Sequence, residues 1–199
     1  MENRWKRTLY RDWIIQIFSL MSFSFGLPFL PYYIQDLGVT DPEKLRLFTG
    51  ILSSAPAIGM GIMAPIWGMV ADRYGKKPML LRAMISASLI LTGLGLVNSV
   101  TGVLVLRALQ GFLTGTITAA SALVAGETPK AKMAYALGLM VSASFIGRTV
   151  GPAVGGILAE TLGYKPSFYL GGATMLMCFF LVLFFVKETK QNEKLHGKL

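Results

Sequence analysis

Charged residues are scarce in this sequence, and the residues that usually bind metals are nearly absent. Only 15% of the 199 residues are charged, whereas soluble domains contain about 25%. The chain has one cysteine, Cys178, and one histidine, His196. A single cysteine excludes an internal disulfide, and one cysteine with one histidine excludes the clustered ligands of a zinc site.

Catalytic and nucleotide-binding motifs are missing as well. The segments between the apolar runs contain neither a Walker lysine motif nor a Ser/His/Asp arrangement. We therefore expect no catalytic residues, no cofactor and no metal, and a protein that is not an enzyme.

Long hydrophobic runs are present instead. Crossing a bilayer takes about 20 apolar residues, and six runs of this kind follow one another. The predicted fold is an all-α membrane protein with transmembrane helices at approximately residues 12–34, 47–70, 78–98, 102–125, 133–159 and 167–186. The third run is long enough only if Arg82 reaches the interface with its long side chain. One transmembrane domain would then occupy residues 12–186, between an N-terminal segment at 1–11 and a tail at 187–199.

The basic residues behind the formal charge of +9 are distributed unevenly along the chain. Fourteen of the lysines and arginines lie in the N-terminal segment, in the second and fourth gaps between the spans and in the tail, which all face one side of the membrane. Three lie in the gaps that face the other side. By the positive-inside rule both termini are cytoplasmic in a multi-pass protein of the cell membrane. The basic residues thus indicate membrane orientation, and we expect a lipid bilayer and no nucleic acid as partner.

An internal repeat is present. Residues 68–78 align without a gap with residues 156–166, at an offset of 88. Each copy lies between the second and third helix of a group of three. Two successive groups of three must have opposite orientations in the membrane, so the sequence predicts two inverted three-helix repeats. The alternative is chance, since glycine often ends helices and proline often starts them.

The first copy of the repeat is an unusual cytoplasmic loop. It combines glycines, an acid and bases at Gly68, Asp72, Arg73, Gly75, Lys76 and Lys77. An Asp at a helix boundary, such as Asp72, can pair with Arg73 or with a neighbouring helix N-terminus. Contacts of this kind can form in one conformation and break in another, as a gate requires. An ordinary basic loop would explain the positive charges but not the acid.

The fourth helix contains Arg107, Gln110 and Gly111, and Gly115 completes a GxxxG pattern. An arginine inside a span costs at least about 2.5–3.5 kcal/mol on insertion scales, so we expect a partner for Arg107. The alternative is that its side chain reaches the external interface. The two glycines predict close packing against another helix.

The fifth helix contains glycines at intervals of four residues and a proline: Gly147, Gly151, Pro152, Gly155 and Gly156. This pattern predicts a smooth helix face that can slide against another helix, with a bend at the proline.

Arg148 lies near the middle of the fifth helix, too deep to reach an interface easily. No Asp or Glu lies inside any predicted span. Its counter-charge must then come from a missing segment, a partner chain or an anionic ligand. A structural role for Arg148 is the alternative to a role in a cavity.

Taken together, these motifs resemble the N-terminal six-helix half of a major facilitator superfamily transporter. Residues 68–77 resemble motif A of that family, residues 106–111 motif B, and residues 147–156 motif C, which is typical of its antiporters. Residues 26–31 resemble the first-helix motif of twelve-helix drug:proton antiporters. The amino acids of several short segments are similar to those of the MdtG-like multidrug efflux branch.

The resemblance implies proton-coupled efflux of drugs or metabolites by alternating access. It implies that the Asp72 loop stabilises one gate state, that Arg107 assists proton coupling and that the glycine face lets the fifth helix move. Two departures stand out: Arg148 occupies a variable position, and the family needs about twelve helices. We therefore expect a half transporter that works with a C-terminal half or as a homodimer. The alternatives are a truncated, inactive fragment or an uptake porter.

Overall fold

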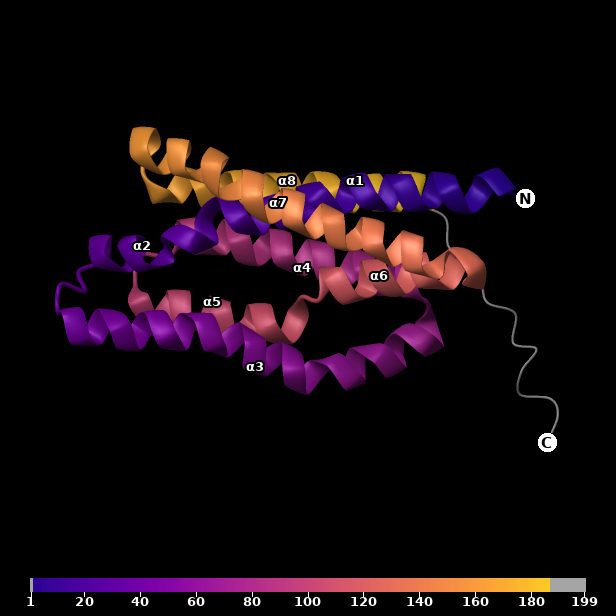
Figure 1. Cartoon of the computed structure of the whole chain (residues 1–199). Coiled ribbons are helices and arrows are strands. Elements are labelled where there is room, and N and C mark those ends of the chain that lie inside the picture. Colours follow the sequence, from indigo (N-terminus) through magenta and orange to yellow (C-terminus); the bar gives the residue numbers. More distant parts are fainter. Residues whose placement is uncertain (1, 187–199) are drawn as a thin grey trace.

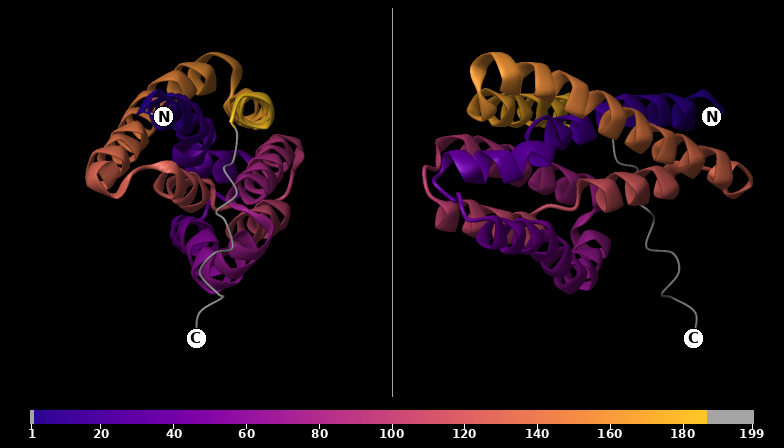
Figure 2. Two further views of the ribbon diagram at one scale, coloured as in Figure 1. Left: turned by 90° about the vertical axis from the view of Figure 1, so that its right-hand side faces the viewer. Right: turned by 60° about the vertical axis from the view of Figure 1, so that its left-hand side comes forward.

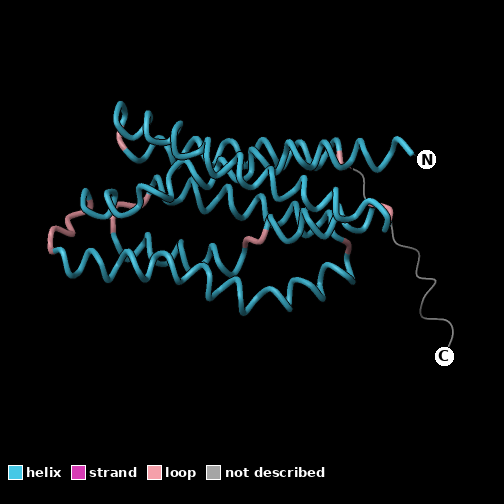
Figure 3. Tube along the Cα trace, in the orientation of Figure 1, coloured by secondary structure: helices cyan, strands magenta, loops and turns pink. Residues whose placement is uncertain are grey.

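A computed structural model describes residues 2–186, with side chains from residue 5 onward, and the predicted tail at 187–199 lies outside the described residues. The elements are α1 (Glu2–Gly26), η1 (Leu27–Phe29), α2 (Leu30–Asp36), α3 (Pro42–Tyr74), α4 (Lys76–Leu96), α5 (Val100–Leu113), α6 (Thr116–Glu127), η2 (Lys130–Lys132), α7 (Met133–Leu162) and α8 (Tyr164–Phe185). Figure 3 shows that short loops join them.

Six helical segments in the described part are long and apolar enough to cross a membrane, which confirms the predicted all-α membrane fold. They are Trp5–Asp36, Pro42–Tyr74, Lys76–Leu96, Val100–Glu127, Lys130–Leu162 and Tyr164–Phe185. Most extend beyond the apolar runs, because polar end residues can remain helical while their side chains reach water. At the start of α3, for example, the Asp41 side chain accepts a hydrogen bond from the Glu43 N–H at 2.9 Å, and Pro42 occupies the first turn.

The helices form a bundle in which both ends of the described chain lie on the same side (Figures 1 and 2). The junctions between α3 and α4 and between α6 and α7 lie on that side as well (Figure 1). Six lysines and arginines lie at or next to these two junctions, whereas three lie at the junctions on the opposite side. The arrangement therefore agrees with the charge asymmetry of the sequence.

The two inverted repeats can be recognised in the packing. In the repeat, the first span corresponds to the fourth, the second to the fifth, and the third to the sixth. The contact of α1 with α7 thus corresponds to that of α5 with α3, and the contact of α1 with α8 corresponds to those of α5 and α6 with α4. The symmetry relates α4 and α8 to each other, and these two helices pack together extensively.

The aligned turns of the repeat have the same backbone structure. Gly75 and Gly163 have φ values of 101° and 84°, in the left-handed region that favours glycine. Their N–H groups donate to the carbonyls of Ala71 and Ala159 at 2.9 and 3.1 Å. Equal geometry at equal register argues against chance as the origin of the repeat.

The core lies mostly among α1, α4, α7 and α8. One apolar cluster contains Leu80, Met84, Met140, Met175 and Val182, and a second surrounds Ile34, Leu91 and Phe168. By contrast, α3 has only Leu52 and Gly59 fully buried among its described residues. It also bends along its length (Figure 1), and it contains Pro56 and Pro65, which lack an N–H for the helix ladder.

Candidate binding cavity

Two spans are interrupted along their length. In the first span α1 ends at Gly26, and the short η1 helix precedes α2. In the fourth span α5 ends at Leu113 and α6 begins at Thr116, with Gly115 at φ 129° between them. Leu27 and Gly115 are 88 residues apart, which is the offset of the internal repeat. Interruptions at corresponding positions of inverted repeats are typical of solute-binding sites in membrane proteins.

The interruption in the fourth span corrects one expectation. A Cβ atom added to Gly115 would meet only the Thr118 hydroxyl, at 3.6 Å, so the prediction that Gly115 packs closely against another helix is wrong. Gly111 does pack closely, because a Cβ there would lie 2.5 Å from the carbonyl oxygen of Pro56 on α3. The sequence pattern did not distinguish a packing glycine from a glycine that ends a helix.

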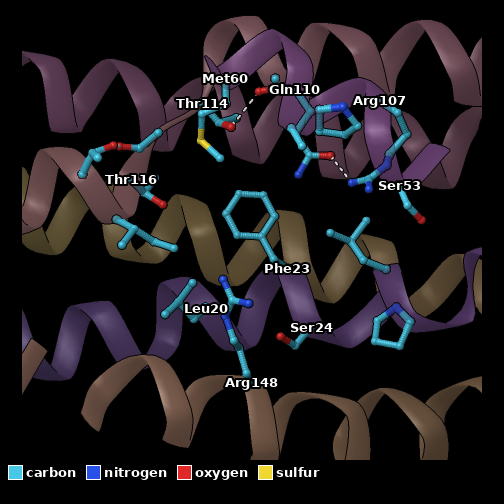
Figure 4. Close-up of a pocket in the computed structure, with 18 residues that line it drawn as sticks. Leu20, Phe23, Ser24, Ser53, Met60, Arg107, Gln110, Thr114, Thr116 and Arg148 are labelled. Carbon is cyan, nitrogen blue, oxygen red and sulfur yellow. Dashed lines mark hydrogen bonds between the residues drawn. The ribbon is translucent and has the colours of Figure 1, made fainter. Parts of the chain in front are cut away.

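A cavity of about 720 Å³ lies at these interruptions, between α1, α3, the α5–α6 span and α7 (Figure 4). Its apolar lining is Leu20, Phe23, Leu27, Pro28, Pro56, Ala57, Met60 and Ile117, with glycine backbone at Gly111 and Gly115. Its polar lining is Ser24, Ser53, Arg107, Gln110, Thr114, Thr116, Thr118 and Arg148. An apolar wall with a few convergent polar groups suits an amphipathic small molecule.

Two arginines give the cavity its charge. Among the described residues that line it, Arg107 and Arg148 are the only charged ones, and there is no acid. Serine and threonine hydroxyl groups add donors and acceptors around them. The electrostatic potential inside the cavity is therefore positive and favours anionic groups.

Arg107 is held from two sides. Its side chain is 8% exposed. Its Nε donates to the Leu52 carbonyl of α3 at 2.9 Å, and one terminal nitrogen donates to Oε1 of Gln110 at 2.6 Å (Figure 4). The alternative that Arg107 reaches the external interface is therefore wrong, and Gln110 is the partner that the sequence left open.

We expect Arg107→Lys to lower the free energy of unfolding by about 1 kcal/mol, because one ammonium group cannot reproduce both hydrogen bonds. Chemical denaturation of the purified protein in detergent would measure this loss. Lys44→Arg, at an exposed site near the start of α3, is the control and should be neutral. Equal stability of Arg107→Lys and wild type would contradict the assigned contacts.

Arg148 has a different environment. It is exposed at the cavity wall, and it makes no hydrogen bond or ion pair to any residue that the structure describes. In Figure 4 its side chain extends from α7 past Leu20 toward the cavity. The prediction that no acid of this chain supplies its counter-charge holds for residues 5–186.

The glycine pattern of α7 faces α1. A Cβ at Gly147 would lie 2.7 Å from the Ile17 carbonyl oxygen, and Cβ atoms at Gly151 and Gly155 would clash with Ser24 and with the Phe25 carbonyl. Gly156 lies off this contact, since a Cβ there would meet only Phe29, at 3.4 Å. The helix continues through Pro152 without interruption.

The lysines that follow the turn between α3 and α4 contact two further helices, α8 and α6. Lys77 Nζ donates to the Leu183 carbonyl on α8 at 2.9 Å, and Lys76 Nζ lies 2.8 Å from the position of a Cβ at Gly126 on α6. Asp72, however, is exposed and has no hydrogen bond or ion pair within the described residues. Within the described residues Asp72 thus pairs neither with Arg73 nor with a helix N-terminus, and the Arg73 guanidinium lies over the Tyr74 ring, at 5.5 Å.

Two further groups were misplaced by sequence reasoning. The guanidinium of Arg82 lies 3.5 Å from the ring centre of Trp67 on α3, so it stacks on an aromatic side chain. Its Nε and one terminal nitrogen are buried without a hydrogen-bond partner.

Asp12 lies inside the first span and is 2% exposed. The expectation that no acid lies within a span is therefore wrong. The polar spacing of Asp12, Gln16 and Ser19 in an apolar segment was the available signal.

Comparison with known proteins gives one consistent family. The family model described as Major Facilitator Superfamily matches residues 13–198. The multidrug resistance protein MdtG of Proteus mirabilis is 39% identical over 186 residues, which cover 94% of this chain and 46% of that protein. The multi-drug resistance efflux pump PmrA homolog of Lactococcus lactis is 42% identical over 184 residues, covering 92% of this chain and 45% of the relative.

The fold also resembles a solved structure. The crystal structure of the human organic anion transporter MFSD10 (TETRAN) superposes with a TM-score of 0.78 at 17% identity, over 93% of this chain and 48% of that one. The chain thus spans about half the length of the curated relatives it matches. The resemblance to MdtG-like proteins that the motifs indicated is confirmed.

Proposed function

Because the chain belongs to the Major Facilitator Superfamily, we propose that it forms one half of a transporter that moves small organic molecules across the membrane by alternating access. The cavity between two helix interruptions at equivalent positions of the inverted repeats carries this proposal. Such a site can open to one side and then to the other when the repeats rock about it. The function is binding and translocation, without chemical conversion of the solute.

The second half would come from another six-helix unit or from a second copy of this chain. Support comes from α3, which buries few residues within this half and exposes large apolar side chains such as Ile58, Ile62 and Met69. The side of the cavity not walled by this half would be closed by the same partner. The exposed Asp72 carboxylate is free to pair with a cation of that partner, so that the loop acts as a gate.

We infer export as the direction of transport and protons as the coupling ion. The names of the relatives describe multidrug resistance and efflux, and the glycine pattern of α7 resembles the antiporter motif. The glycine contacts of α7 with α1 give a surface on which these helices can slide. Arg107, hydrogen-bonded to Gln110 beside the cavity, would assist the coupling.

The protein is a multi-pass membrane protein. We place it in the plasma membrane with both termini in the cytoplasm, because the basic residues gather at that side of the bundle. The predicted boundaries of the membrane domain, residues 12–186, belong to the same proposal.

The cavity chemistry favours solutes with an anionic group on an apolar body. The Arg107 guanidinium keeps its charge, but two of its N–H groups are already used in hydrogen bonds to Leu52 and Gln110, which leaves Arg148 as the arginine without a protein partner that a ligand anion can reach. A carboxylate, sulfonate or phosphonate would remove the cost of an unpaired arginine inside the membrane.

Transport of an anionic fluorescent dye tests this function. Proteoliposomes would contain the chain alone and the chain assembled with a second six-helix half, under an imposed proton gradient. We expect dye movement with the assembled or oligomeric protein, and Met60→Trp should reduce it because it fills the cavity. Leu89→Trp on α4 is the control, since Leu89 is exposed, lies outside the α3 face assigned to the second half and does not line the cavity.

Absence of dye movement in every assembly state would reject the proposal and favour the alternative of an inactive fragment. Movement of the dye into the compartment that corresponds to the cytoplasm, with the gradient, would favour an uptake porter.

A further inference from the structure

Two polar side chains inside the first span have no partner. Asp12 is 2% exposed and Gln16 is 1% exposed. Neither carboxylate oxygen of Asp12 and neither polar atom of the Gln16 amide makes a hydrogen bond within the described residues. Buried polar groups in proteins are nearly always satisfied, so four orphan atoms on successive turns of one helix require an explanation.

The surroundings of the pair are apolar. Leu9 and Ile15 on α1 belong to the same buried cluster as Val124 on α6, Met140 on α7 and Val182 on α8. Each of these side chains is at most 5% exposed. An ionised carboxylate in such a place would lose its hydration and gain no counter-charge.

The neighbouring charged and titratable groups do not supply a counter-ion. On α6 the acidic Glu127 interacts electrostatically with Asp12 and has the same sign. On α7 the nearest titratable group along the helix is Tyr135, which is hydrogen-bonded to Tyr10 at 3.1 Å. On α8 the Cys178 thiol donates to the Ile15 carbonyl at 3.7 Å.

The other cations on these helices have other surroundings. Lys6 lies over the Trp5 ring at 5.8 Å, and Arg7 on α1 and Lys132 before α7 are exposed. On α8, Lys165 donates to Oδ1 of Asn98 at 2.6 Å. Arg11 donates to the Phe185 carbonyl at 2.9 Å, and Arg148 reaches the cavity about two turns of α7 beyond the level of Met140. The protonated, neutral acid is therefore the form that the buried site accommodates. Its O–H group can donate to the Gln16 carbonyl one turn away, directly or through a water molecule.

We propose that Asp12 and Gln16 form a proton-binding site within the membrane domain. The site is separate from the cavity, since neither residue lines it. In the conformation described here the Asp12 carboxyl holds its proton. Movement of α1 along the glycine face of α7 admits water from the end of the bundle where α8 terminates; the O–H bond then breaks, its electron pair stays on the carboxylate, and the proton passes to water.

This proposal rests on the proposed transport function and gives it a titrating group. A buried ionisable residue in a span is a usual element of proton relays. Ser19 and Ser22 continue the same buried face of α1 toward the middle of the membrane, with Ser22 donating to the Ser19 carbonyl at 2.7 Å. Their hydroxyl groups extend the polar path beyond Gln16.

Infrared difference spectroscopy of the purified chain in lipid tests proton binding without reference to transport. We expect a protonated-carboxyl carbonyl band at neutral pH that disappears in Asp12→Asn and remains in Asp36→Asn, the control at the exposed end of the same span. The band should decrease on raising the pH. Persistence of every protonated-carboxyl band in Asp12→Asn, or absence of such a band from wild type, would overturn the proposal.

A transport measurement then tests coupling. We expect Asp12→Asn to lose dye accumulation driven by a proton gradient and to keep exchange of dye for dye, which needs no net proton movement. Retained proton-driven accumulation in Asp12→Asn would overturn the coupling role. If wild type moves no dye at all, the proposed function fails, while the infrared result still decides whether Asp12 binds a proton. Gln16→Leu, which removes the acceptor but keeps the carboxyl, should weaken proton binding; an unchanged titration would refute the role of Gln16.

Discussion

Gly155→Ala is expected to destabilise the contact between α1 and α7 by about 1–3 kcal/mol, the usual cost of overpacking a close contact. The added methyl group would clash with the Phe25 carbonyl oxygen, and backbone cannot rotate away as a side chain can. This contact is the most extensive between any two helices of the described chain. Thermal or chemical unfolding of the purified protein in detergent would measure the loss.

The matched control for Gly155 lies on the same helix. A Cβ at Gly138 would meet nothing within 4 Å, so Gly138→Ala should be neutral or more stable by up to about 1 kcal/mol, the gain in helix propensity. Similar stability of the two alanine variants would show that the glycine face does not set the distance between α1 and α7. The antiporter-like pattern would then lose its structural explanation.

Arg148→Gln is expected to weaken binding of an anionic dye about tenfold, or ~1.4 kcal/mol, and to leave binding of an uncharged analogue nearly unchanged. The reason is that Arg148 faces the cavity without a partner among the described residues, so its charge is available to a ligand. Binding would be measured by fluorescence titration of the assembled transporter. Salt screens charges that are in contact with water. Added salt should therefore reduce the difference in affinity between the charged and the uncharged dye where the cavity is open to water.

Arg46→Gln is the control for overall charge, because Arg46 is exposed on α3 and does not line the cavity. It should affect neither dye. If Arg148→Gln reduced binding of the charged and the uncharged dye equally, Arg148 would have a structural role, and the preference for anions would be rejected.

Some sequence motifs predicted helix contacts correctly and others did not. The glycine spacing of α7 correctly marked a smooth face, because side chains four residues apart share a face of any α-helix. The same reasoning failed for Gly111 and Gly115, which also have that spacing. There the helix stops between them, and only Gly111 meets another backbone. The spacing of glycines does not reveal a break in the helix.

The ionisable residues were harder to place. Arg107 was expected to need a partner, and Gln110 was already part of the same motif, yet an interfacial position was also possible from sequence. Asp12 was placed at the end of a span because the apolar run begins at the next residue, Trp13. The helix in fact begins earlier, and Arg11 turns outward to the Phe185 carbonyl while Asp12 turns inward. One residue along a helix is a rotation of about 100°, which hydropathy averaging cannot resolve.

The sequence by itself determined the six spans, the asymmetry of charge and the inverted repeat, because each depends on composition or register along the chain. The tertiary structure decided that both interrupted helices meet at one cavity, that Arg148 faces this cavity and that Asp12 is enclosed within the bundle. These properties depend on which faces of distant helices meet, and burial and hydrogen bonding are determined by that packing.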